Sequence, residues 1–591
     1  MKKIIHARNF GVIPDTGLDC TESFRNLLEE NPEDTVLIIE KGRYDFYSEK
    51  AEKEMLYLSN TNCDQPQNLA IILRNMHNTD FEGNGSEFIF HGQVLPFTVD
   101  NSNDIALRNI IIDWDIPLTA EGLIVAKGEN FADLEIDQTQ FPCKVVNNRL
   151  VFTGEDWESP LMDWTNTEFN KYTKRVAFKS GDRFPKTAQE ELGPGFIRFH
   201  GNFGAYGEPG NRVVVRHNVR RHPGIFANAS KNLCFENIIL HCTGGLGILA
   251  QFCENLNFDG IRFEPNSAKG RYVVSCHDDG IHLSNNKGAV TIENCTFHGL
   301  MDDPVNIHGT AARIRSIVDW RTLECEFVHH ETKGFPGWAA QGQQISFIDR
   351  NTMTQIGTGT VSNYILIEPE RFIITFEEDI PPVLGKGDAL ENITNTASLT
   401  CRNNLFGSCR ARGILASTPQ KILIENNIFE STGSAVLLPG DANYWYESGA
   451  CADVTIRNNI FTDSCLTSMY QFCEAIISIL PEIPRPDSKR PFHRNIKICD
   501  NVFQAYDYPV LYAKSTENLE FARNRIVRSR SFARWHPRKH MLSFEYCSKV
   551  VIKDNLLIGD VLGRDVHIQG MAAEDVLLQE SQEICLKTSE T

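Results

Sequence analysis

The 591-residue sequence lacks any unbroken apolar run near the roughly 18 residues that a membrane-spanning helix needs, so we expect no membrane span. Its 17 cysteines include no Cys-x-x-Cys pair, and neither a zinc site nor a disulfide framework is indicated. Lys and Arg number 58 against 77 Asp and Glu, and they form no basic run, which argues against a nucleic-acid partner. Reduced, buried thiols in a cytoplasmic protein are the simplest interpretation.

The N-terminal segment also lacks the apolar core of a secretory signal. Two lysines are followed by only two apolar residues before His6. We therefore expect a cytoplasmic protein, although a signal peptide removed upstream would leave the same N-terminus. The sequence does not fix the oligomeric state, and a homodimer is one state that it allows.

What the sequence does contain is a repeated phrase of an apolar residue, a polar residue that is often Asn, and an apolar pair. The ten copies begin at Leu107, Phe235, Phe258, Ile292, Cys401, Ile424, Ile456, Ile498, Phe521 and Ile552. Three intervals, 235→258, 401→424 and 498→521, are 23 residues each. Short alternating strands at this period predict an all-β, right-handed parallel β-helix with one phrase per coil. A β-sandwich is the alternative, but it gives no reason for equal intervals.

The polar position of the phrase has its own interpretation. An Asn at a strand corner tolerates the left-handed backbone region, and its amide can also hydrogen-bond along the stack of coils. We therefore expect these Asn residues to serve both purposes.

Two interruptions divide the repeat. Alternating strands replace the phrase in each of them, and we interpret both as inserted antiparallel β-barrel-like domains. The second begins directly after the stretch that carries the candidate site and could roof it. The expected divisions are 1–114 (cap and first coils), 115–221 (first insertion), 222–309 (coils with the candidate site), 310–392 (second insertion) and 393–591 (last coils and cap).

A helix is expected near the start of the chain. Asp19 and Glu22 have capping-box spacing, and Phe24, Leu27 and Leu28 form an apolar stripe. Such a helix would cover the open end of the solenoid, which otherwise exposes its core.

Two aspartate pairs, Asp278–Asp279 and Asp302–Asp303, lie within residues 277–309. Asp279 and Asp302 are separated by the same interval as one coil. Equivalent positions on adjacent coils lie about 4.8 Å apart. The spacing therefore predicts a patch of three or four carboxyl groups.

Such a patch cannot ionise fully at low cost, so at least one proton should be retained to a raised pH. One protonated acid beside ionised bases suits cleavage of a glycosidic bond. Calcium ligation is a rival use, and ordinary acidic turns are the plainest interpretation. The two pairs recur at the interval of one coil, and His277, Asn306 and His308 lie nearby in the sequence. Together these observations favour a functional site over ordinary acidic turns. These three side chains are candidates for binding sugar hydroxyls, although buried histidines and a corner Asn are common without such a role.

Other candidates are weaker. Trp114, Trp320 and Trp338 could stack on sugar rings, but packing in the core is the commoner role for each. Cys276 and Cys295 lie near the aspartates, yet no His/Asp set is arranged to activate a thiol, and both are interpreted as core.

The HDDG and MDDPVNIHG motifs, with the FGVIPDTG start and the two interruptions, resemble glycoside hydrolase family 110, the α-1,3-galactosidases, over most of the chain. They are similar, more distantly, to the polygalacturonases. The resemblance implies exo-acting, inverting hydrolysis of terminal α-1,3-linked galactose, as in blood-group B or linear α-galactosyl glycans, without a metal or cofactor. It implies Asp302 as general acid and Asp279 with Asp303 as the water-activating pair. Asp278 matches no catalytic position and would orient Asp279 or a histidine.

Inversion further predicts that the acid and the water-activating carboxyls lie more than about 5.5 Å apart. No Arg-x-Lys segment follows the histidine as in polygalacturonases, so a neutral sugar is expected rather than a uronate. Two alternatives stay open. One is a polysaccharide lyase or uronate epimerase with a Lys or Arg base, and the other is a non-catalytic carbohydrate-binding solenoid. Whether a branching fucose is required is left undetermined.

Overall fold

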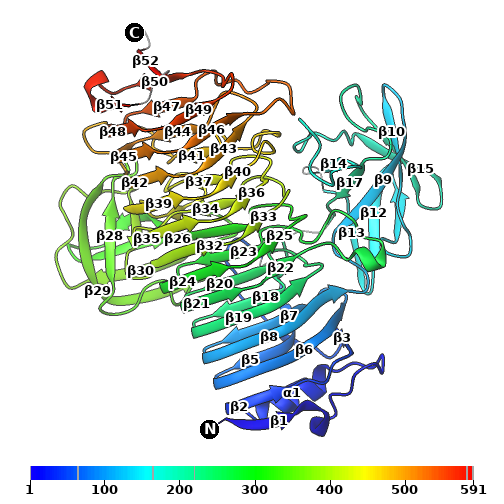
Figure 1. The fold of residues 1–591 in the computed structure, drawn as a ribbon. Coiled ribbons are helices and arrows are strands. Elements are labelled where there is room, and N and C mark those ends of the chain that lie inside the picture. Colours follow the sequence, from blue (N-terminus) through cyan, green and yellow to red (C-terminus); the bar gives the residue numbers. More distant parts are fainter. Residues whose placement is uncertain (1, 63–64, 163–165, 218–219, 581–583, 589–591) are drawn as a thin grey trace.

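The computed structural model describes residues 2–62, 65–162, 166–217, 220–580 and 584–588. They form an elongated solenoid of stacked parallel strands, with two β-domains projecting from its sides (Figure 1). The predicted parallel β-helix with inserted antiparallel domains is confirmed. Within the described ranges, no helix is long and apolar enough to cross a membrane.

Three rows of parallel strands build the solenoid. The first row contains β1 (Lys3–His6), β2 (Glu33–Ile38), β6 (His77–His91), β8 (Asn103–Trp114), β19 (Lys231–Leu240), β21 (Glu254–Asp259), β24 (Lys287–Glu293), β32 (Ala397–Arg402), β35 (Lys421–Glu425), β39 (Asp453–Arg457), β42 (His493–Cys499), β45 (Thr516–Ala522), β48 (Ser548–Lys553) and β51 (Val576–Gln579). The second row follows it around the corner and contains β3 (Arg43–Tyr47), the ends of β6, β8 and β19, then β22 (Arg262–Phe263), β25 (Thr296–Phe297), β33 (Leu405–Phe406), β36 (Ile428–Phe429), β40 (Ile460–Phe461), β43 (Val502–Ala505), β46 (Arg525–Arg528) and β49 (Leu556–Ile558).

The third row completes each coil. It contains β5 (Gln67–Arg74), β7 (Leu95–Asp100), β18 (Ile225–Asn228), β20 (Ile248–Gln251), β23 (Ile281–Ser284), β26 (Val305–Ile317), β34 (Ile414–Ala416), β37 (Val436–Leu438), β41 (Ile477–Ile479), β44 (Leu511–Lys514), β47 (Leu542–Glu545), β50 (Asp565–Gln569) and β52 (Cys585–Thr588). Two short strands pair antiparallel with this row, β4 (Glu52–Glu54) with β5 and β38 (Glu447–Ser448) with β26.

The repeated phrase forms the first corner of each coil, in the predicted register. Phe235 pairs with Phe258, Cys401 with Ile424, and Ile498 with Phe521, so each of the three equal intervals is one coil. The last Phe of successive phrases stacks in a buried column, with ring centroids 4.6–5.5 Å apart, through Phe263, Phe297, Phe406, Phe429, Phe461 and Phe503. The burial of these rings is a main source of the solenoid's stability.

The two expected roles of the corner asparagines belong to two neighbouring residues. One residue takes the left-handed backbone, and the next forms the amide hydrogen bonds along the stack. Asn458 has a left-handed backbone (φ 56°) and is exposed. The next residue, Asn459, is buried, accepts from the backbone N–H of Asn427, and donates its amide to Asn501 on the following coil. The same amide ladder runs through Asn404, Asn427, Asn459, Asn501, Asn524 and Asn555. One corner residue therefore turns the chain while the next joins the coils.

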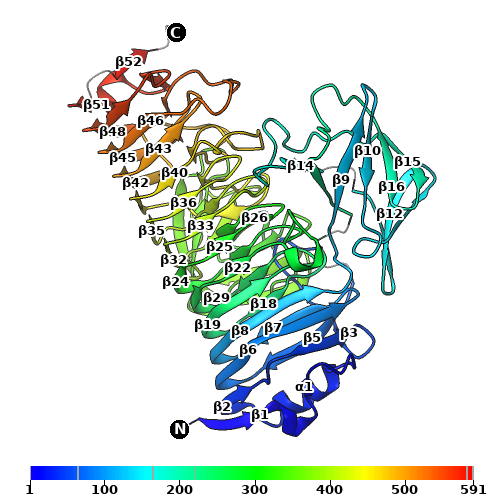
Figure 2. The ribbon, with the colours of Figure 1, turned by 45° about the vertical axis from the view of Figure 1, so that its right-hand side comes forward.

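The N-terminal end is covered as expected by helix α1 (Thr21–Glu29), beside β1 and β2 (Figure 2). Phe24, Leu27 and Leu28 are buried in the same core as the coils. The expected capping box is not formed, because the residue before the helix is Cys20, which makes no side-chain capping bond. The Asp19 carboxylate instead accepts from the backbone N–H of Thr21 at 2.9 Å. Short 3₁₀ turns occupy Ala7–Phe10, Ser267–Lys269 and Ala573–Asp575.

The first insertion is an antiparallel sheet that stands beside the coils at the right of Figure 1. Its six strands pair as an open sheet in the order β14 (Thr167–Phe169), β17 (Arg212–Val215), β9 (Ala120–Lys127), β10 (Phe131–Glu135), β16 (Phe196–His200) and β15 (Ala188–Gly193). A second sheet of β11 (Cys143–Val146), β12 (Arg149–Gly154) and β13 (Trp157–Pro160) accompanies it, and the two share one core. The loop after β14 reaches back to the coils, where Arg175 pairs with Glu430.

The second insertion is a closed six-stranded antiparallel barrel. The end of β26 pairs with β27 (Thr322–Glu326), and the ring continues through β30 (Arg371–Phe376), β29 (Gln355–Glu368), β28 (Gln344–Ile348) and β31 (Ala389–Asn392) back to β26. Trp338 is fully buried in its core. The chain therefore passes from a solenoid strand directly into the barrel and returns to the next coil.

A buried ion pair lies where the chain leaves the solenoid for the first insertion. Asp113, at the end of β8, accepts from the Arg271 guanidinium (Nη1–Oδ1 2.7 Å) and from the Asn266 amide at 2.9 Å. Burial alone would raise the pKa of Asp113, yet Arg271 and then Lys269 lower it to about 2. The pair joins two segments that lie far apart in the sequence, on either side of the first insertion.

Candidate active site

The three carboxyls predicted to be catalytic meet at one corner of the solenoid, where the second row of strands turns into the third. Asp279 precedes β23, and Asp302 and Asp303 precede β26. The pairing of Ile281 with Val305 makes this coil one residue longer than the common period. Asp279 is therefore level with Asp303, and the expectation that it is in phase with Asp302 is wrong by one residue. The choice of Asp279 over Asp278 nevertheless agrees with the placement of the side chains.

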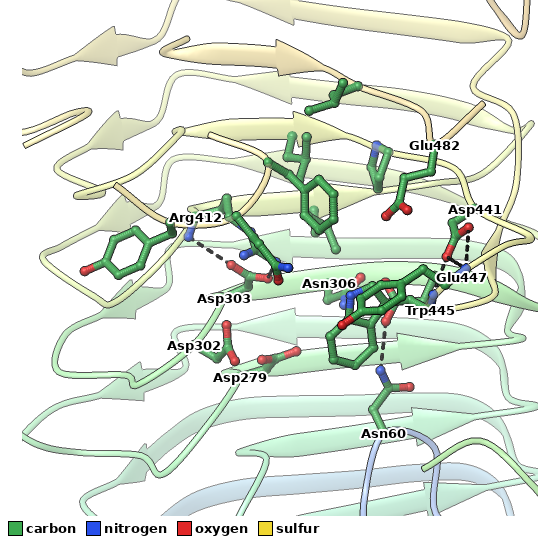
Figure 3. Close-up of a pocket in the computed structure, with 18 of the residues that line it drawn as sticks. Asn60, Asp279, Asp302, Asp303, Asn306, Arg412, Asp441, Trp445, Glu447 and Glu482 are labelled. Atoms are coloured by element: carbon green, nitrogen blue, oxygen red, sulfur yellow. Dashed lines mark hydrogen bonds and ion pairs between the residues drawn. The ribbon is translucent and has the colours of Figure 1, made fainter. Parts of the chain in front are cut away.

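Asp279, Asp302 and Asp303 converge closely (Figure 3). One carboxyl oxygen from each lies within 4.8 Å of the others. This approach is closer than the wider separation that inversion predicted, because side chains from two adjacent coils point to the same spot. Asp302 is the most accessible, with 14% of its side chain exposed against 5% for Asp279 and 3% for Asp303.

Three guanidinium groups surround the carboxyls. Arg220 Nη2 lies 2.8 Å and Arg410 Nη1 3.2 Å from Asp302, and Arg412 pairs with Asp303 at 2.9 Å. Burial would raise the pKa of Asp302, but Arg410 and Arg220 hold it below its usual range.

The other two carboxyls keep their protons more readily. Burial raises the pKa of Asp303 to about 7, although Arg412 opposes the shift. Burial and the negative charge of Asp302 raise the pKa of Asp279 well above its usual range. The expected shared proton is therefore present, and in the free site it favours Asp279 and Asp303 over Asp302.

Asp278 points away from the other three, into the protein. It is fully buried, with its carboxylate in ion pairs with Arg216 and with Arg220 Nε at 3.0 Å. Burial would raise its pKa, but Arg220, His277 and Arg216 hold it far below the usual range. Because Arg220 also contacts Asp302, Asp278 positions that arginine.

The carboxyls open into a cavity of about 460 Å³, a size typical of small-ligand sites. Asn306 lies in its floor, and its Oδ1 is buried without a hydrogen-bond partner among the described residues. A buried acceptor of this kind is costly unless a ligand supplies a donor. Asn306 is thus well placed for a sugar hydroxyl.

The two predicted histidines do not line the cavity. His277 is buried behind it, with Nδ1 2.7 Å from Asp278. His308 is buried beneath the floor, where its Nε2 lies 3.0 Å from His282 Nε2. His282 in turn lies 2.7 Å from Asp279. Both predicted residues contact other buried side chains rather than the cavity, and His282, which lies between His308 and Asp279, was not predicted.

The wall opposite the aspartates was also missed. It carries Trp445 and a second group of acids, Asp441, Glu447 and Glu482, from strand β38 and the loops that follow β37 and β41 (Figure 3). Tyr470 also lines the cavity but lies on the aspartate side, where the Arg410 guanidinium is 5.4 Å from its ring. These loops lie far beyond Asp303 in the sequence, and no motif marks them. Arg412 alone could have been predicted from the sequence. It lies 109 residues after Asp303, and when the residues of the second insertion are left out of the count it falls on the next coil, level with Asp303.

The second insertion reaches the rim of the site, where Glu331 acts on the charge of Arg220. No residue of 310–392 lines the described part of the cavity, although the ring of His329 packs against Trp445 at 4.5 Å. The first insertion contributes instead, because Asp182 lines the cavity and forms two 2.7 Å hydrogen bonds with Arg410. Trp114 and Trp338 are core residues, and Trp320 is exposed on the barrel.

Three carboxyls this close could in principle hold a cation. Here the guanidinium groups of Arg220, Arg410 and Arg412 already balance their charge. Cys276 and Cys295 are buried free thiols whose pKa burial raises, as expected for core residues.

Comparison with known proteins identifies the family. Residues 120–213 match the family model described as GLAA-B beta-barrel domain I, and residues 322–390 match GLAA-B beta-barrel domain II. The chain is 41% identical to α-1,3-galactosidase B of Bacteroides thetaiotaomicron, over 99% of this chain and 96% of that protein. It belongs to the α-1,3-galactosidase family of glycoside hydrolases. The resemblance carried by the aspartate motifs is thereby confirmed.

Further members of this α-1,3-galactosidase family are more distant. α-1,3-Galactosidase B of Akkermansia muciniphila is 35% identical over 94% of this chain and 70% of that protein. Among solved structures, a family 28 exopolygalacturonase of Yersinia enterocolitica aligns with 98% of this chain and 78% of that one, at 12% identity and a TM-score of 0.40.

Proposed function

We propose that the protein hydrolyses terminal α-1,3-linked galactose from glycans, acting on chain ends with inversion of configuration. The observation that carries the proposal is the convergence of Asp279, Asp302 and Asp303 within 4.8 Å in a member of the α-1,3-galactosidase family. Acid and base groups at one point are what glycosidic cleavage needs.

We assign Asp302 as the proton donor to the leaving oxygen. Its larger exposure to the cavity places it nearest an incoming glycosidic bond. Asp279 and Asp303 lie deeper and level with each other, where they can hold one water between them as its bases. Asn306 supplies a hydroxyl acceptor, and Trp445 on the opposite wall offers a ring face for the sugars.

The charges set a condition on this assignment. Arg220 and Arg410 keep Asp302 ionised in the free site, so a proton must move onto it when the substrate binds. A sugar that displaced either guanidinium from Asp302 would raise its pKa and allow that transfer. Asp303, with a pKa of about 7, is the competing donor.

The spacing of the carboxyls does not support inversion, because their nearest oxygens lie within 4.8 Å of one another. A separation of about 5–5.5 Å between carboxyls is typical of retaining enzymes. Inversion is supported instead by the two deeper carboxyls. A retaining enzyme needs a single carboxylate free to attack the sugar, whereas Asp303 is held by the side chain and backbone N–H of Arg412.

A neutral sugar also agrees with the arginines. Arg410 and Arg412 form an Arg-x-Arg segment in the cavity, yet Asp182, Asp302 and Asp303 already pair with them. No lysine lines the cavity among its described residues, so the base of a lyase or epimerase is not evident.

The test is galactose release from Galα1-3Gal, linear and fucosylated, with α1-4 and α1-6 disaccharides as matched controls. We expect free galactose from the α1-3 linkage alone, unchanged by a chelator. An unsaturated, ultraviolet-absorbing product, or loss of activity with chelator, would contradict the proposal. The fucosylated and linear substrates together show whether the branch is required.

A further inference from the structure

A line of hydrogen-bonding groups runs beneath the cavity floor from Asp279 to His308, which lies beside Glu447 of the opposite wall. Asp279 Oδ2 lies 2.7 Å from His282 Nδ1, and His282 Nε2 lies 3.0 Å from His308 Nε2. His308 Nε2 is also 3.7 Å from Glu447 Oε1. Both imidazoles are buried, and their rings meet edge to face. The line thus joins a proposed base to the opposite wall without passing through the cavity.

Secondary structure places these rings. His282 and His308 occupy outward-facing positions of β23 and β26, while Ile281, Leu283, Val305 and Ile307 point into the core. Because the strands are parallel and adjacent, the rings lie one coil apart, and they lie diagonally because His282 pairs with Asn306. Because His282 and His308 lie on two strands of the solenoid, the fold itself holds the two rings in line.

The hydrogen bonds fix how many protons the line holds. The Gly309 carbonyl can only accept, so His308 Nδ1, 2.8 Å away, carries a proton. One proton must lie between the two Nε2 atoms, and one between His282 Nδ1 and Asp279. The line therefore holds three protons. Two neutral imidazoles and an ionised carboxyl would hold only two. Asp279 and the two rings together therefore carry an extra proton and no net charge.

A base that already holds a proton cannot accept one from water. We infer that His282 and His308 form a proton relay, in which the proton of Asp279 is moved to His308 beside Glu447 to free the Asp279 carboxylate. The O–H bond of Asp279 breaks as His282 Nδ1 gains a proton, and His282 Nε2 passes its own proton to His308 Nε2. His308 becomes a cation and Asp279 an anion, and no co-reactant is needed.

Glu447 is built to stabilise that cation. Its Oε1 also accepts from the Asn60 amide at 2.8 Å, which fixes the carboxylate beside His308. Burial would raise the pKa of Glu447, but His308 and His282 lower it. The ionised carboxylate is thus available as counter-ion.

The other titratable groups near Asp279 are Asp302, Asp303, Arg220, Asp278 and Glu447. Asp302 and Arg220 also face His282. Asp278 is held ionised by its arginines, whereas Asp303, whose pKa is raised to about 7, titrates alongside the relay in both wild type and variant. His282 and His308 are positioning residues for Asp279, and their effect should appear in the pH dependence.

The inference rests on the proposed hydrolysis, and the first experiment is the pH profile of kcat/KM for His308→Gln. Glutamine can keep a hydrogen bond to His282 but cannot take up a proton. We expect the acidic limb to move up by about one pH unit or more, with kcat/KM recovering at high pH and KM little changed. His493→Gln is the matched control, because His493 is equally buried in β42 and far from the relay in its contacts. An unshifted limb in His308→Gln would overturn the inference.

A second measurement needs no turnover, so it separates failure of the relay from failure of the proposed function. Nitrogen-15 spectra of the wild-type histidines, assigned with His282→Gln and His308→Gln, report which ring nitrogens carry protons. We expect His308 Nδ1 to be protonated throughout, and His282 to change from the Nε2–H to the Nδ1–H tautomer as the extra proton leaves Asp279 and the carboxylate needs a donor. A His282 ring that keeps one tautomer from about pH 5 to 9 would contradict the relay.

Discussion

At the residue scale, the site combines carboxyls that the sequence reveals with partners that it hides. Asp279, Asp302 and Asp303 were predicted because they recur at the interval of a coil, and the structure brings them together. Arg410 and Arg412 were not predicted, because the second insertion separates them from the aspartates that they pair with. Local spacing shows that the two aspartate pairs meet, but it does not distinguish Asp279 from Asp278, and the charge that governs their protons comes from elsewhere in the chain.

The role of Asp302 can be tested by leaving-group dependence. Asp302→Asn should reduce kcat/KM on Galα1-3Gal by about 10²–10⁴-fold, since general acid catalysis contributes this much. An aryl galactoside with a good leaving group needs less protonation, so its hydrolysis should fall much less. Steady-state kinetics on both substrates provide the measurement.

Asp279→Asn and Asp303→Asn are the matched controls for that comparison. Both remove water activation, so a better leaving group should not restore activity. If Asp303→Asn were rescued by the aryl substrate and Asp302→Asn were not, the proton donor would be Asp303, as its raised pKa allows.

At the scale of the element, each corner of the β-helix uses one residue to turn the chain and the next residue to bond one coil to another. The phrase predicted the strands and their register because its apolar positions alternate and its period repeats. The phrase could not show that the adjacent Asn458 and Asn459 have different roles, because the two positions carry the same amino acid. Only the stacked coils distinguish the exposed Asn458 from Asn459, which bonds to coils on both sides.

Paired substitutions at this corner test the division of roles. Asn458→Gly should be nearly neutral, because glycine readily adopts the left-handed backbone found there. Asn459→Ala removes the acceptor of the buried Asn427 backbone N–H and the amide donor to Asn501 and the Ile424 carbonyl, and should lower the free energy of unfolding by about 1–3 kcal/mol. Chemical denaturation measures both, and equal effects would contradict the assignment.

The ion pair at the root of the first insertion makes stability depend on pH. The pKa of Asp113 is lowered to about 2, so its contribution is complete above about pH 4 and is lost as pH falls from there toward 2. A shift of this size corresponds to about 2–3 kcal/mol. Asp113→Asn should destabilise at pH 7 by about 3–5 kcal/mol, because Arg271 is left buried without its counter-ion.

Thermal unfolding at pH 7 and pH 3 measures that effect. The gap in Tm between wild type and Asp113→Asn should narrow at the lower pH, where the wild-type carboxyl begins to protonate. Asp560→Asn is the control, since its pair with Arg530 is exposed and should leave the unfolding curve unchanged at both pH values. A gap that does not narrow would contradict the account.

At the scale of the whole molecule, the solenoid collects side chains from distant segments around one cavity. Asn60 comes from an early coil, and Trp445 and Glu447 come from coils beyond the second insertion (Figure 3). Asp182 comes from the first insertion. The repeat and the family resemblance predicted the architecture and the aspartates. The opposite wall could not be predicted, because its loops follow no period and their positions depend on how the coils stack.

The most direct test of the account is the anomeric form of the sugar first released from Galα1-3Gal, observed by proton NMR before mutarotation. Two deep carboxyls that activate water opposite a donor at Asp302 predict β-galactose as the initial product. α-Galactose as the initial product would mean retention through a covalent intermediate, and would contradict the roles assigned to all three aspartates.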